Sequence, residues 1–130
     1  MAPRLVGMSD DLEALAHQLF DLARAGDTER LAAYIDAGAP VDMRNENGDT
    51  FLILAAYNNA PETVAMLLEK GADVEAENDR GQRALSCAAF KKDVESAKLL
   101  VDAGADPDAG TPPARGAAEL FGAPEILALF

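Results

Sequence analysis

Apolar and polar positions along this chain follow a pattern that returns after 33 residues. Helical spacing is visible inside the pattern, for example at Val64, Leu67 and Leu68, which fall at positions i, i+3 and i+4. The residue pairs separated by the full period include Gly48 and Gly81, Leu52 and Leu85, Ala55 and Ala88, Leu67 and Leu100, and Gly71 and Gly104. One helix pair cannot bury its own apolar face, so the repetition predicts an all-α fold of helical units stacked into a solenoid.

Each unit is predicted to contain a turn and two helices. In the central unit Gly48 marks the turn and a first helix covers 51–58. Pro61 lies in the first turn of the second helix, where a proline is tolerated. Gly71 follows that helix as a left-handed terminator. Residues 10–36 repeat this design with a longer first helix.

The period divides the chain into four units within a single domain over 10–130. The first unit is expected to act as a cap, because polar residues such as Gln18 and Asp21 interrupt its first helix and can cover an open core edge. The last unit is shorter, since Glu95 and Glu125 are 30 residues apart. We predict a disordered or added leader at 1–9, an N-terminal capping repeat at 10–44, repeats at 45–77 and 78–110, and a truncated C-terminal capping repeat at 111–130.

The closing unit ends in an apolar segment. A short second helix is predicted over 124–130, and it carries Ile126, Leu127 and Phe130. Phe130 either folds back on the preceding unit or leaves an edge that can associate with another copy. We therefore expect a monomer, with weak self-association through the C-terminal edge as the alternative.

Charge narrows the choice of partners. The chain has 130 residues, 49% of them hydrophobic, which is enough for one domain with a continuous core. Lys and Arg number 11 against 23 Asp and Glu, which gives a net charge of −12. The electrostatic field of this negative charge repels nucleic acid and anionic membranes and attracts basic protein surfaces. An acidic solenoid surface can equally serve only to keep the chain soluble.

Candidate chemistry is sparse. Cys87 is the single cysteine, so no disulfide can form within the chain, and its position matches Leu54 of the central unit, which favours a small core residue. His17 lacks further ligands at metal-binding spacing. No apolar run reaches the length of a membrane span, and the first eight residues lack the apolar centre of a secretory signal, so a cytoplasmic location is expected. We predict no catalytic residue, no cofactor and no metal.

The repeat resembles that of the ankyrin repeat family, whose unit is a β-turn followed by two antiparallel helices, with Thr-Pro-Leu-His at its start and Gly-Ala-Asp at its end. The resemblance covers residues 10–130. The matching positions in the two central units are Gly48, Thr50, Leu52, Ala55, Ala56, Val64, Leu67, Leu68, Gly71, Ala72, Asp73 and Val74, and then Gly81, Leu85, Ala88, Ala89, Leu99, Leu100, Gly104, Ala105 and Asp106. It implies an ankyrin-repeat solenoid with helix-turn-helix units joined by β-turn tips.

The start of each central unit departs from the family pattern. The four residues read Thr50-Phe51-Leu52-Ile53 in one unit and Arg83-Ala84-Leu85-Ser86 in the next, so neither has the histidine that helps to tie neighbouring turns in the family. We therefore expect weaker cohesion between the turns.

The resemblance implies no catalysis and predicts binding of another protein through the concave face, which the turn tips and the exposed sides of the first helices form. Carried onto this chain, the contact residues are Glu46, Asn47 and Asp49 on one tip, Asp79, Arg80 and Gln82 on the next, and Arg24, Tyr57, Asn58, Phe90 and Lys91 on the helices. Arg24, Tyr57 and Phe90 follow one another at 33-residue steps, and aromatic and Arg side chains are enriched at interface hot spots. The alternative is that Tyr57 and Phe90 simply pack together between units.

Three functions compete at this point. The leading hypothesis is a non-enzymatic protein-binding module that acts as a small adaptor or regulator. The second is an acidic inhibitor or immunity-type protein that blocks a basic partner surface by charge. The third and weakest is a hydrolytic or redox enzyme that uses His17 or Cys87.

Overall fold

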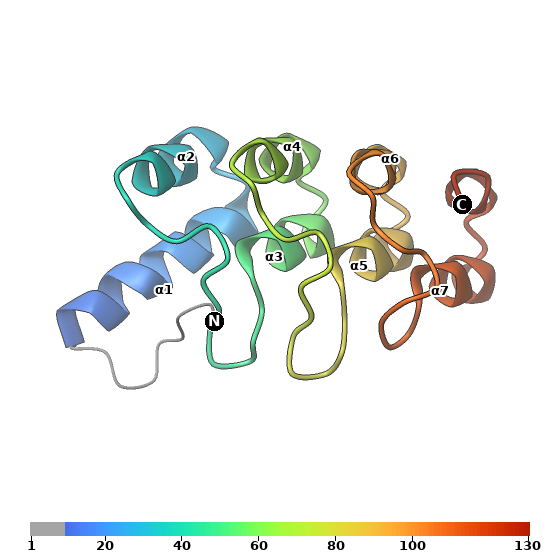
Figure 1. Ribbon diagram of the computed structural model, residues 1–130, viewed down its shortest axis with the longest axis horizontal. Coiled ribbons are helices and arrows are strands. Elements are labelled where there is room, and N and C mark those ends of the chain that lie inside the picture. The colour runs from blue at the N-terminus through green and yellow to red at the C-terminus, as the bar shows by residue number, and fades with distance from the viewer. Residues whose placement is uncertain (1–9) are drawn as a thin grey trace.

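The computed structural model describes residues 10–130, and this part of the chain forms eight helices (Figure 1). The helices are α1 (Asp10–Ala25), α2 (Thr28–Asp36), α3 (Phe51–Tyr57), α4 (Pro61–Glu69), α5 (Ala84–Lys91), α6 (Val94–Asp102), α7 (Ala114–Phe121) and α8 (Pro124–Leu127). The leader expected at 1–9 lies outside the described residues. Within 10–130 no helix is long and apolar enough to cross a bilayer.

The helices stack in two layers. The inner layer contains α1, α3, α5 and α7, each in contact with the next, and the outer layer contains α2, α4, α6 and α8 in the same order (Figure 1). Long connections that follow α2 and α4 project beyond the inner layer as turn tips. This arrangement confirms the all-α solenoid expected from the 33-residue period.

Small buried side chains allow the inner helices to approach closely. Six consecutive residues of α3, from Phe51 to Ala56, are buried, and six of α5, from Ala84 to Ala89, are buried in the same way. A helix that is apolar on all sides needs neighbours on all sides, and here the adjacent inner helices and the outer layer supply them. In the outer layer Leu67 is fully buried.

Local capping fixes where the helices begin. The Thr50 hydroxyl accepts a hydrogen bond from the Ile53 N–H at 3.2 Å at the start of α3. Arg83 stands at the matching position before α5 and cannot cap in this way. There the Ser86 hydroxyl accepts from the Arg83 N–H at 3.2 Å and donates to its carbonyl oxygen at 2.8 Å. The first turn is therefore stabilised by different side chains in the two helices, by Thr50 in α3 and by Ser86 in α5.

Other side chains and a backbone hydrogen bond tie the turns where the histidine of the repeat pattern is missing. Asn78 Nδ2 donates to Asp49 Oδ1 on the preceding tip at 2.9 Å, and the Asp79 N–H donates to the Asn47 carbonyl oxygen at 3.0 Å. A second series of hydrogen bonds joins the loops that follow the outer helices. There Asp42 accepts from the Asp73 N–H at 2.9 Å, and Glu75, 33 residues after Asp42, accepts from the Asp106 N–H at 3.1 Å. Neighbouring turns are thus joined by polar contacts that do not use a histidine.

The closing helix is shorter than predicted. A helix was expected over 124–130, whereas α8 ends at Leu127. The Leu129 and Phe130 N–H groups donate to carbonyl oxygens three residues earlier, which is the tighter geometry of a final turn. Phe130 folds back against the core, and the Arg115 guanidinium carbon lies 5.7 Å from the centre of its ring.

Two glycines allow a matched test of how closely the turn tips approach each other. Both Gly48 (φ +77°) and Gly71 (φ +89°) are left-handed, so alanine at either position should cost about 1 kcal/mol. A Cβ at Gly48 would also lie 2.6 Å from Asp79 Oδ1 and 2.9 Å from the Asp79 nitrogen, whereas a Cβ at Gly71 meets nothing within 4 Å. We expect Gly48→Ala to lose about 1–3 kcal/mol more stability than Gly71→Ala in urea unfolding. Equal losses would contradict this tip-to-tip packing.

Candidate protein-binding groove

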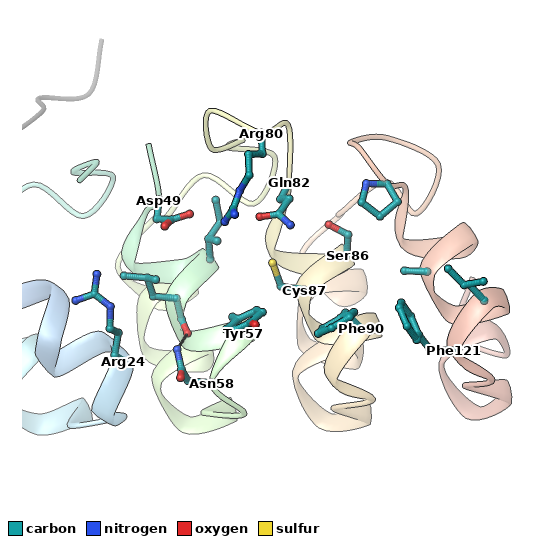
Figure 2. Close-up of a pocket in the computed structure, with 15 residues that line it drawn as sticks. Arg24, Asp49, Tyr57, Asn58, Arg80, Gln82, Ser86, Cys87, Phe90 and Phe121 are labelled. Atoms are coloured by element: carbon teal, nitrogen blue, oxygen red, sulfur yellow. Dashed lines mark hydrogen bonds between the residues drawn. The ribbon is translucent and has the colours of Figure 1, made fainter. Parts of the chain in front are cut away.

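A cavity of about 580 Å³ opens on the inner face of the solenoid, between the turn tips and the ends of the inner helices (Figure 2). Residues from every inner helix contribute to it. Its lining comprises Arg24, Asp49, Ile53, Leu54, Tyr57, Asn58, Arg80, Gln82, Ser86, Cys87, Phe90, Pro112, Ala117, Leu120 and Phe121. We call this cavity the groove. Seven residues predicted to contact a partner line it, namely Arg24, Asp49, Tyr57, Asn58, Arg80, Gln82 and Phe90.

Three aromatic rings from successive inner helices form a row along the groove. The Tyr57 and Phe90 rings are stacked, with centres 6.1 Å apart and planes 6° apart. Phe90 and Phe121 meet edge to face, with centres 4.8 Å apart and planes 88° apart. The side chains nevertheless remain 46%, 44% and 39% exposed, in chain order. This aromatic row, Tyr57, Phe90 and Phe121, therefore combines mutual packing with an open apolar surface.

Cationic side chains stand beside the aromatic row. Lys91 Nζ lies 5.1 Å from the centre of the Tyr57 ring, a cation–π distance. Figure 2 shows Arg80 extending from its turn toward the groove, between Asp49 and Gln82. Arg24 lies at the α1 end of the groove and donates to Asp21 at 2.9 Å. Lys91 itself does not line the cavity.

Asp49 and Gln82 are fixed in the groove wall. The Asp49 side chain is only 8% exposed, and Asn78 Nδ2 donates to one of its oxygens. The same amide group donates to Gln82 Oε1 at 2.8 Å. Asn58 is held in a similar manner, because its Nδ2 donates to the Leu54 carbonyl oxygen at 2.8 Å. These side chains already have partners, so they shape the groove and leave the rings as its open surface.

The other predicted tip residues lie outside the cavity. Glu46 is exposed, and its carboxylate oxygen lies 3.3 Å from His17 Nε2 on α1. Asn47 and Asp79 are exposed on neighbouring tips and share the backbone hydrogen bond described above. His17 is an exposed side chain, and the part of the chain that the structure describes contains no group of three or more His, Cys, Asp or Glu side chains placed to hold a metal ion.

Sequence reasoning missed the α7 side of the groove. Leu120, Phe121, Ala117 and Pro112 belong to the shortened closing unit, where the 33-residue step from Phe90 points to the wrong position. The 30-residue spacing between Glu95 and Glu125 was the available signal. Applied to Phe90, it points to Leu120, directly before the third ring of the row.

Cys87 lies at the base of the groove and is buried. Burial raises the pKa of its thiol to about 12, and the nearby Asp49 carboxylate adds to the increase, while Arg80 opposes it. A thiol with so high a pKa carries almost no thiolate at neutral pH. Cys87 therefore behaves as a small apolar side chain, in agreement with its match to Leu54.

Comparison with known proteins agrees with this architecture. The family model for ankyrin repeats, which contains three copies of the repeat, matches residues 19–111, and the chain belongs to the ankyrin repeat family. An ankyrin repeat protein of Pseudomonas aeruginosa is 43% identical over 54 residues. That match spans 42% of this chain and 32% of the relative, so it covers about a third of the relative's length. Ankyrin repeats are generally non-catalytic modules that mediate binding to other proteins.

The raised pKa of Cys87 predicts slow thiol labelling in the folded state. At pH 8 the folded chain should hold about a thousandfold less thiolate than an exposed thiol with the ordinary value of 9.0. Because the pKa lies far above the measured range, the labelling rate should rise about tenfold per pH unit between pH 7 and 9. A disulfide reagent such as dithionitrobenzoate measures this rate.

The control for this labelling is Glu62→Cys in a Cys87→Ala background, since Glu62 is exposed on α4. That thiol should react at the ordinary rate in the folded chain. Equal labelling rates for Cys87 in the wild-type chain and for the thiol of the Glu62→Cys control would show that Cys87 is accessible to solvent, contrary to its burial.

Proposed function

We propose that this chain is a non-catalytic protein-binding module that acts as a small adaptor or regulator through its concave face. The observation that carries the proposal is the aromatic row. Tyr57, Phe90 and Phe121 lie in a cavity of about 580 Å³ and keep a large exposed fraction although they pack on one another. Rings held in place before binding lose little conformational freedom on association, and aromatic anchors dominate binding energy at interfaces.

The ionisable groups of the groove support binding rather than chemistry. The Cys87 thiol is protonated at neutral pH because burial raises its pKa, so it is a poor nucleophile. Asp49 is committed to its hydrogen bond with Asn78. An enzyme using His17 would need catalytic partners beside it, and within residues 10–130 the side chain paired with His17 is Glu46, on the exposed rim. The absence of catalysis and the cytoplasmic location remain predictions.

A second candidate is the acidic inhibitor that covers a basic surface. The outer helices favour it, because α2, α4, α6 and α8 together carry seven Asp or Glu against two Lys or Arg. Binding of this kind would weaken steeply as salt is added, whereas binding through buried rings would change little. Charge reversal at Glu46 and Asp79 tests whether the carboxylates of the turn tips contribute to such salt-dependent binding.

The proposal is tested by truncating the aromatic row. Partners captured from a lysate and identified by mass spectrometry should bind Tyr57→Ala and Phe90→Ala chains with a loss of about 2 kcal/mol or more for each substitution. The helical circular dichroism signal should remain. Leu15→Ala is the matched control, because Leu15 on α1 is 39% exposed and lies outside the groove. Undiminished binding by both aromatic variants would place the interface on another face.

A further inference from the structure

Charge is distributed unevenly between the two layers of the solenoid. The outer helices carry most of the helical carboxylates, with seven Asp or Glu among α2, α4, α6 and α8. The central inner helices, α3 and α5, contain no Asp or Glu, and their single charged residue is Lys91. The two helices at the centre of the groove therefore carry no negative charge, although the whole chain has a net charge of −12.

The groove and its edge, where Lys91 lies just outside the cavity, have a local excess of positive charge. Arg80 points toward it and Lys91 stands over the Tyr57 ring. Among residues 10–130 neither of these cations forms an ion pair. Arg24 is paired with Asp21, and the one carboxylate in the lining, Asp49, is only 8% exposed and bonded to Asn78. Arg80 and Lys91 are thus left to interact with a bound molecule.

We propose that the groove binds a peptide segment of a partner protein in which an aromatic or leucine side chain is flanked by a carboxylate. The apolar side chain would lie against the aromatic row, and the carboxylate would be bound by Arg80 or Lys91. This inference rests on the proposed function and adds the chemistry of the partner. A basic peptide, which the net charge of the chain would suggest, is disfavoured in this groove because it would bring like charges together.

Screening by salt explains why the cations beside the groove, and not the net charge of the chain, determine which peptide binds. In physiological salt the field of an exposed charge is largely lost beyond about 8 Å, so carboxylates on the outer layer contribute little inside the groove. Charge pairs formed next to buried rings are partly removed from water and are screened much less. The outer acidic face therefore slows the approach of an acidic peptide more than it weakens the bound state.

The experiment pans a phage-displayed library of random short peptides against the wild-type chain, with the Tyr57→Ala/Phe90→Ala double variant for counter-selection. Enriched peptides should pair an aromatic residue or leucine with Asp or Glu. One such peptide and its Asp→Asn or Glu→Gln analogue are then titrated by fluorescence anisotropy. The analogue should bind the wild-type chain about tenfold more weakly and should bind an Arg80→Gln/Lys91→Gln chain with the same affinity as the acidic peptide.

Lys98→Gln supplies the matched control, because Lys98 is an exposed cation on the outer helix α6, and it should keep the tenfold difference. Enrichment of apolar peptides that are neutral or basic would overturn the acidic preference and leave the groove as the binding face. Peptides that bind the double aromatic variant equally well, or the absence of any enrichment, would count against both the groove and the acidic preference. Self-association abolished by Phe90→Ala would identify a second copy as the occupant and overturn the inference.

Discussion

The structure depends on the burial of each helix pair by the next one. The inner helices α3 and α5 are buried through most of their length, and no single unit could cover them. Alanine at 55, 56, 88 and 89 keeps the helices close, and each of these side chains is fully buried. Because every unit is needed by its neighbour, the 33-residue period is a constraint of packing, and in the units that keep this period it also fixes where the exposed side chains fall.

The groove follows from that constraint. Close stacking brings the last residues of successive inner helices into line, so the rings of Tyr57, Phe90 and Phe121 contact one another. The turn tips stand beside them, tied by the hydrogen bond from Asn78 to Asp49. The aromatic surface is therefore held by the same packing that stabilises the fold, and it needs no rearrangement to become available to a partner.

The sequence was sufficient to predict the solenoid and the central part of the groove, because both depend on the period. It could not show that Asp49 is buried and bonded to the Asn78 amide of the next tip, because the period does not reveal side-chain contacts between tips. It also missed Phe121, because the closing unit is trimmed and the row continues in a shifted register. The shorter final helix depended on local hydrogen bonding after Leu127, where apolar spacing carries no information. The unit boundaries given above remain our proposal.

The claim that the groove is the binding face is tested most directly by the amide chemical shifts of this chain, measured with and without a bound partner. In the bound chain we expect the largest changes at the ends of α3, α5 and α7, around the aromatic row, and at the adjoining turn tips. The amides of α4 and α6 in the outer layer should change little. The largest changes on α4 and α6, with the residues around Phe90 unaffected, would contradict the assignment of the groove as the binding face.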